Sequence, residues 1–177
     1  GVQMHVYTKA AGPIGRFIGR DLKLRVDQFE CTFEPRTEPL PPSESAASAM
    51  GTTSSSKVLT SVTVMADSLV PVADVDSRKF ERLLLTLQET EKVSRRTRLS
   101  VLDSARFPRI TYSVDREDAT SIEGRLELRG EMHPLRCTKV RDGPEVVITC
   151  PVDYTKHGAA PYTHLLGLFS VNPTVEV

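Results

Sequence analysis

The chain has 177 residues, enough for one domain with a substantial core. It carries 23 Lys and Arg against 23 Asp and Glu, and this zero formal net charge argues against a nucleic-acid-binding surface. No apolar run approaches the roughly 18 residues that a membrane helix needs, so we expect no stable membrane insertion.

The first half of the chain begins with β-strand patterns. Val2–Thr8 is a short first strand, and apolar residues then occupy every second position from Leu22 to Val26 and from Phe29 to Phe33. The alternation slips by one residue at Asp27–Gln28, which would turn the later side chains to the other face. We therefore expect one long strand that bends sharply at 27–28.

A polar segment interrupts these strands. Residues 35–56 contain four prolines, many serines and almost no large apolar side chain. Such a segment buries too little apolar surface to offset its ordering entropy, so we expect a flexible loop. Another β-rich run follows at Lys57–Met65.

One stretch has helical periodicity. Ser77 is a suitable N-cap for a helix with apolar residues at the i, i+3, i+4 and i+7 positions Phe80, Leu83, Leu84 and Leu87. A second, shorter helical turn is expected at Leu99–Arg106, before Pro108.

The second half returns to strands separated by turn residues. In Ser121–Gly130, apolar and polar residues alternate strictly, which is typical of a strand with one buried and one solvated face. Consecutive strands with short turns predict an antiparallel sheet, which must close or pack on another sheet. We expect a mainly β, up-and-down, lipocalin-like barrel of eight strands, with a sandwich as the alternative. The expected strands are Arg109–Val114, Ser121–Gly130, His133–Val140, Glu145–Val152 and Leu166–Val177.

The three cysteines, Cys31, Cys137 and Cys150, form no C-x-x-C pair and each lies on the apolar side of an expected strand. This pattern gives neither a disulfide framework nor a zinc site, so we expect buried thiols. Unpaired thiols favour a cytoplasmic location, with a periplasmic or secreted one as the alternative.

Residues with catalytic or metal-binding chemistry lack the required patterns. His133, His157 and His164 have no histidine partner at i+4 and no carboxylate at ligand spacing, so we expect exposed or half-exposed side chains. There is no nucleophile motif and no phosphate-binding glycine loop. We expect no enzyme activity, no metal and no cofactor.

Four segments resemble the YceI family of lipocalin-like, polyisoprenoid-binding proteins. They are VLDSARFPRITYSV at 101–114, IEGRLELRGEMHPL at 122–135, VYTKAAGPIGRFIGRDLKL at 6–24 and PYTHLLGLFSVNPTVEV at 161–177. Arg20 stands where the family subgroup has histidine, which is a departure. The resemblance implies one barrel domain over 1–177 that holds a long isoprenoid or similar lipid and has no catalytic machinery.

An apolar chain in such a barrel would contact the inward apolar residues, although the same residues could instead pack against each other. We therefore expect binding or transport of an isoprenoid quinone or alcohol, with a filled structural or protein-interaction module as the alternative. A homodimer is a possible assembly. The expected ligand-binding residues are Phe29, Phe33, Val62, Val64, Ile110, Tyr112, Leu126, Leu128, Leu135, Val146, Ile148, Phe169 and Val171.

Overall fold

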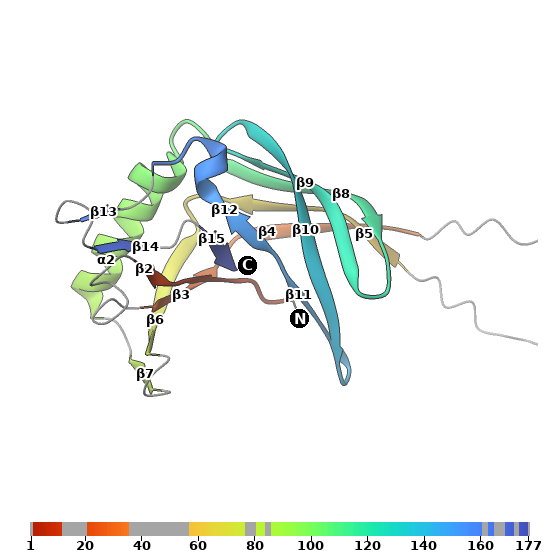
Figure 1. Cartoon of the computed structure of the whole chain (residues 1–177), viewed down its shortest axis with the longest axis horizontal. Helices are drawn as coiled ribbons and strands as arrows, with labels where there is room; N and C mark the ends of the chain where they lie inside the picture. The colour runs from red at the N-terminus through yellow and green to blue at the C-terminus, as the bar shows by residue number, and fades with distance from the viewer. Residues whose placement is uncertain are drawn as a thin grey trace, which may run out of the picture.

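The fold is mainly β, with one α-helix, in the residues that the computed structural model describes (Figure 1). These residues are 2–11, 21–35, 57–76, 81–83, 86–160, 163–164, 169–171 and 174–176. The expected flexible loop lies almost entirely outside them, apart from Pro35.

Six antiparallel strands form what we call the curled sheet. It contains the strand Ser121–Leu128 (β9), which the alternating pattern predicted, at its centre between β8 and β10. Figure 1 shows that this sheet bends into half of a barrel. Its order is β11 (Glu145–Thr149), β10 (Glu131–Asp142), β9, β8 (Arg109–Glu117), β5 (Lys57–Met65) and β4 (Phe29–Pro35).

A second six-stranded sheet, the opposing sheet, is built mostly from shorter strands. Its order is β12 (Pro151–Asp153), β15 (Thr174–Glu176), β1 (His5–Thr8), β3 (Asp21–Val26), β6 (Leu69–Asp76) and β7 (Glu81–Leu83). A small third sheet consists of β13 (Thr163–His164), β14 (Phe169–Val171) and β2 (Ala10–Ala11).

The bend expected at 27–28 is confirmed. β3 ends at Val26 in the opposing sheet, and β4 begins at Phe29 in the curled sheet. The neighbouring connection between β5 and β6 bends beside it, where the Ser68 hydroxyl donates to the carbonyls of Gln28 (3.2 Å) and Met65 (2.7 Å). The Gln28 carbonyl also accepts from the Met65 amide, and the Met65 carbonyl from the Ser68 amide, so the hydroxyl adds to the backbone bonds at this corner.

The expectation of a closed eight-stranded barrel is wrong. The described strands fall into three sheets, of which only the curled sheet has a barrel-like curvature. The chain passes from one large sheet to the other between β3 and β4 and between β5 and β6. It does so again between β11 and β12, around Cys150. Alternation shows which face of a strand is apolar, but it carries no information on which strands become neighbours.

The expected helix is misplaced. Residues 81–83 form β7, and the helix α2 runs over Leu87–Arg96. Thr86 and Glu89 form a capping box: the Glu89 amide donates to the Thr86 hydroxyl oxygen, and the Glu89 carboxylate accepts from the Thr86 amide. Because this box satisfies the first free amides, it fixes the start of the helix. A π-helical segment, η1 (Thr97–Leu102), continues it and is followed by Asp103 in the left-handed conformation, so the second helical turn begins and ends earlier than expected.

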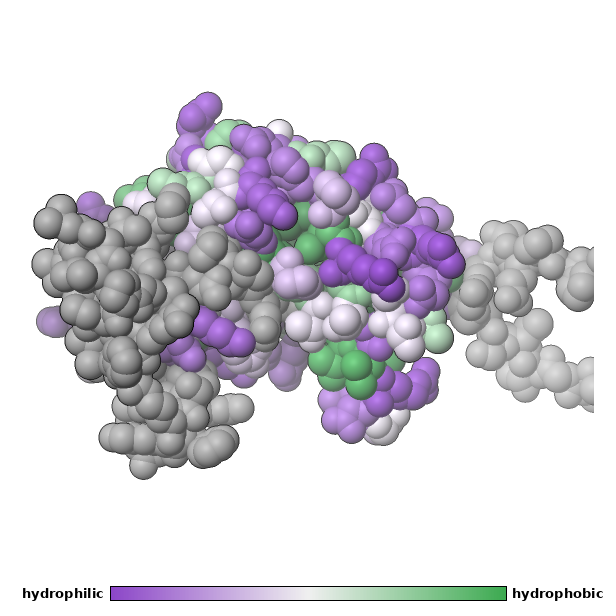
Figure 2. All heavy atoms as spheres, viewed as in Figure 1, coloured by the Kyte–Doolittle hydropathy of each residue, from purple (hydrophilic) through white to green (hydrophobic). Residues whose placement is uncertain are grey.

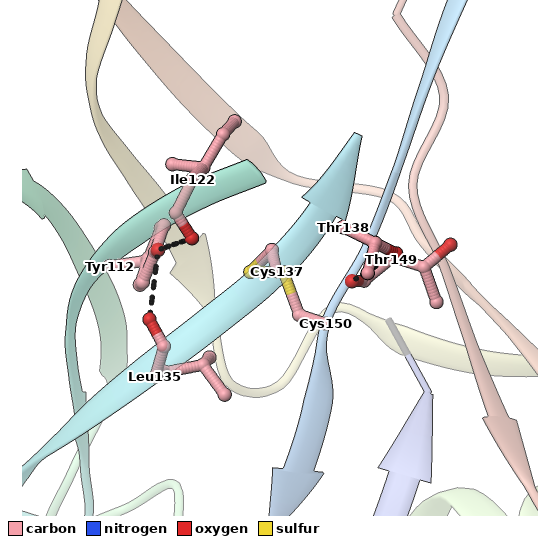
Figure 3. The surroundings of a disulfide bond; sticks show 7 residues. All are labelled: Tyr112, Ile122, Leu135, Cys137, Thr138, Thr149 and Cys150. Atoms are coloured by element: carbon pink, nitrogen blue, oxygen red, sulfur yellow. Dashed lines mark hydrogen bonds between the residues drawn. A yellow bond between two sulfur atoms is a disulfide. The ribbon is translucent and has the colours of Figure 1, made fainter. Parts of the chain in front are cut away.

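The centre of the curled sheet contains a close approach between Gly124 and the ring of Tyr112. A Cβ on Gly124 would lie 2.2 Å from the Ser113 carbonyl oxygen and 2.9 Å from the Tyr112 ring. The Tyr112 hydroxyl lies 3.3 Å from the Ile122 carbonyl and 3.2 Å from the Leu135 carbonyl, which accept its hydrogen bond. Glycine is therefore required on this buried face so that the tyrosine can reach across two strands (Figure 3).

The turn between β8 and β9 is held by Asp118. Its carboxylate accepts from the amides of Thr120 (2.9 Å) and Ser121 (2.7 Å) and from the Ser121 hydroxyl (2.9 Å). The bonds from Thr120 and then Ser121 lower the pKa of Asp118 to about 2, because they favour its charged form.

We predict that Gly124→Ala lowers the free energy of unfolding by about 1–3 kcal/mol, because the added methyl group meets backbone that cannot move aside. Urea denaturation followed by circular dichroism measures this change. Gly143→Ala separates steric overlap from backbone strain: Gly143 has no atom within 4 Å of the added Cβ, so its cost comes only from the positive φ of 59° and should be the smaller one, about 1 kcal/mol. A Gly124→Ala protein as stable as the wild type would contradict the close approach.

We predict that Asp118→Ala destabilises the protein at neutral pH and that this difference shrinks in acid. The folded pKa of Asp118, about 2, is below its ordinary value of 3.8, so its stabilisation is complete above 3.8 and is lost as the pH falls toward 2. Thermal unfolding of both proteins across this range measures the difference. A difference that stays constant down to pH 2 would contradict the assignment.

Candidate ligand-binding cavity

A cavity of about 1590 Å³ lies between the curled sheet and the opposing sheet. Its lining includes Lys92 and Val93 of α2 and Pro144 and Glu145 at the tip of the β10–β11 hairpin, and these two elements lie on opposite sides of the molecule (Figure 1). The cavity therefore extends along the inner face of the curled sheet from the helix to this hairpin. Figure 2 shows apolar residues in a recess between polar residues on one face of the molecule.

Most of the expected ligand-binding residues line this cavity. They are Phe33, Val62, Val64, Ile110, Tyr112, Leu126, Leu128, Leu135, Val146 and Ile148. Phe29 is not among the lining residues and packs against the buried core instead. Phe169 and Val171 belong to β14, and the positions of their side chains lie outside the described part of the chain.

The opposing sheet supplies a wall that the sequence analysis missed. Its lining residues come from β1, β3, β6 and β12, and include Val6, Leu22, Leu24, Val26, Leu69 and Val152. The alternation of Leu22, Leu24 and Val26 was visible in the sequence. It does not show that these residues line the same cavity as Phe33, which follows the bend at 27–28. β6 itself was not expected as a strand.

Burial of the lining residues changes along the cavity. Leu24, Leu126 and Leu128 are buried, whereas Phe33 is 48% exposed and Ile148 is 37% exposed. The last two belong to β4 and β11, the two edge strands of the curled sheet. The cavity is thus enclosed in its middle and opens between these edges.

A charged pair lies within this largely apolar lining. Lys139 of β10 forms an ion pair with Glu117 of β8, and the two side chains are 22% and 19% exposed. Both residues line the cavity. Glu117 reaches the inner face because the register of β8 shifts between Val114 and Arg116, which places Glu117 opposite the buried Ile122. The expected strand ended at Val114, and strict alternation continued beyond it would place Arg116 rather than Glu117 on this face, so the pair was not predicted.

The expectation of three unpaired thiols is wrong, because Cys137 and Cys150 form a disulfide (Figure 3). Thr138 pairs with Thr149 in the β10–β11 ladder, so Cys137 and Cys150 are the next opposed residues. Asp142, Gly143 and Pro144 are turn residues between the expected strands His133–Val140 and Glu145–Val152, and folding the chain there brings the two cysteines together. Cys31 is a free, half-buried thiol whose pKa is raised by burial.

The disulfide removes the basis for expecting a cytoplasmic location. That expectation rested on unpaired thiols, whereas disulfides form and persist mainly in oxidising compartments. The bond also joins β10, which carries Lys139, to the connection that crosses into the opposing sheet.

The histidines differ from expectation at one position. His157, in the 3₁₀ helix η2 (Tyr154–His157), is buried with 4% exposure, and its Nδ1 lies 2.9 Å from the Glu131 carbonyl oxygen. Its ring packs edge-on against the half-exposed His133, with ring centroids 4.8 Å apart. His164 lies in β13, where side chains are outside the described residues. The described residues contain no cluster of three side chains suited to a metal ion.

The chain matches no model of a known protein family, and no curated protein matches it. In the part of the chain that the structure describes, none of the helices has the length and apolar character needed to cross a membrane.

We predict that breaking the disulfide with Cys150→Ser lowers the free energy of unfolding by about 3 kcal/mol, because it frees a short loop in the unfolded chain. Urea denaturation with and without reductant measures this loss. Reductant should destabilise the wild type to a similar extent and leave Cys150→Ser unchanged. Cys31→Ser is the matched control and should retain the response to reductant. A wild-type protein whose free energy of unfolding is the same with and without reductant would contradict the pairing.

Proposed function

We propose that this protein binds a long apolar chain, such as a polyisoprenoid or similar lipid, in the cavity between its two large sheets. The observation that carries this proposal is the size of the cavity together with its aliphatic lining from both sheets. Each methylene group that leaves water for such a site contributes roughly 0.8 kcal/mol. Sequestration of this kind requires no reaction, so the proposed function is binding or transport.

The volume of the cavity favours a large ligand. Pockets for drug-sized molecules measure about 300–1,000 Å³, and this cavity, at about 1590 Å³, exceeds that range. It extends from α2 to the β10–β11 hairpin, so its shape suits an extended chain. The resemblance of segments 101–114 and 122–135 to YceI proteins supports an isoprenoid chain in particular.

A second candidate function is a protein-interaction module, which the β10–β11 hairpin favours. Val140 and Val147 form a cross-strand pair there and are 60% and 48% exposed. Exposed apolar side chains at neighbouring positions are typical of contact surfaces. This alternative, however, assumed a filled interior, whereas the described residues surround a cavity.

We predict that Val62→Trp weakens the binding of the neutral fluorescent dye N-phenyl-naphthylamine by about tenfold, because the indole occupies space equivalent to at least two methylene groups. Val62 is half-buried, lines the cavity and lies beside Tyr112 in the ladder. Fluorescence titration measures the affinity.

Thr63→Trp is the matched control, because Thr63 is the next residue of β5 and its side chain points to the other face of the sheet. It should bind the dye as the wild type does. A wild type that binds neither the dye nor a long-chain alcohol would contradict the proposed function, and so would equal dye binding by Val62→Trp and the wild type.

A further inference from the structure

The Glu117–Lys139 pair is unusual in its position. Both side chains point from the curled sheet into the cavity, about four-fifths buried. Their cross-strand neighbours on the same face are apolar: Glu117 pairs with the buried Ile122, and Lys139 pairs with Ile148. A second ion pair on the same sheet, Arg125–Asp115, lies on the outer face with both side chains about half exposed.

Placing a charged pair on this wall has an energetic cost. Two charges lose hydration when they are buried, and their mutual attraction often fails to compensate for that loss. An apolar pair at 117 and 139 would complete the wall and stabilise the fold at least as well. We therefore expect the pair to contribute to ligand binding rather than to the stability of the fold.

The hydrogen-bonding capacity of the Glu117–Lys139 pair indicates which polar group of a ligand it can bind. The Lys139 ammonium has three donors and the Glu117 carboxylate has several acceptor sites, so each retains capacity beyond their mutual bond. Because the two charges cancel, an uncharged hydroxyl or carbonyl oxygen can bond to the pair without a net electrostatic penalty. A carboxylate or phosphate would be repelled by Glu117 or would have to displace it from Lys139.

The position of the pair along the cavity is consistent with a head-group site. Ile148, the neighbour of Lys139, belongs to the open side of the cavity, whereas Leu126 and Leu128 are buried further along β9. A ligand whose oxygen meets the pair would therefore extend its apolar chain into the enclosed part.

We propose that Glu117 and Lys139 form the head-group site of the cavity, and that the pair selects an apolar chain ending in an uncharged oxygen group over the same chain ending in an anion. This inference rests on the proposed function. It assigns a polar specificity to a site whose affinity comes from apolar burial.

The test compares dodecanol with dodecanoate at neutral pH by displacement of N-phenyl-naphthylamine. Wild-type protein should bind dodecanol about tenfold more tightly than dodecanoate, a difference on the scale of one hydrogen bond to a charged group. Glu117→Gln leaves Lys139 without its counter-charge, so the preference should disappear or reverse. Lys139→Met should weaken dodecanol binding and disfavour dodecanoate further.

Asp115→Asn is the matched control, because it breaks the outer-face ion pair on β8 and should keep the wild-type preference. Dye binding by each variant shows that its cavity is intact. A wild type that displaces no dye with either chain would overturn the proposed function and this inference together. Binding of both chains with a ratio unchanged in Glu117→Gln and Lys139→Met, or a wild-type preference for dodecanoate, would overturn the inference alone.

Discussion

The structure depends on the burial of the inner apolar faces of two sheets that do not fill the space between them. β-strands of alternating polarity must remove one face from water, and here the two large sheets turn those faces toward a shared interior. Leu24 and Leu126 show that burial is complete in the middle, while the edges of the curled sheet stay open. The apolar interior that stabilises the fold is therefore also the surface available to a ligand.

Two local features modify this apolar interior: an inward-facing ion pair and a disulfide. The register shift in β8 turns Glu117 inward, where it meets Lys139 among apolar cross-strand neighbours. The Cys137–Cys150 disulfide covalently fixes the base of the β10–β11 hairpin, close to that lysine along β10. The first feature gives the cavity a polar position, and the second limits the separation of the strands that carry it.

The sequence predicted the strands and the inward faces better than it predicted their assembly. Alternation located β9 and much of the wall that the curled sheet contributes to the cavity, and the slip at 27–28 located the corner, because these signals are local. The closed barrel and the start of the helix were predicted wrongly, and unpaired thiols were expected where a disulfide forms. The apolar spacing from Phe80 to Leu87 resembled a helix, yet the capping box at Thr86 begins α2 later and residues 81–83 pair with β6. The Glu117–Lys139 pair depends on a bulge, which alternation cannot show.

The most direct test of the central claim is a nuclear magnetic resonance measurement of contacts between bound dodecanol and methyl-labelled protein. If the chain binds between the sheets, intermolecular nuclear Overhauser effects are expected from the alkyl chain to Leu126 of the curled sheet and to Leu24 of the opposing sheet in one complex. Contacts confined to exposed methyl groups such as those of Val140, with none to either leucine, would contradict a chain bound between the sheets.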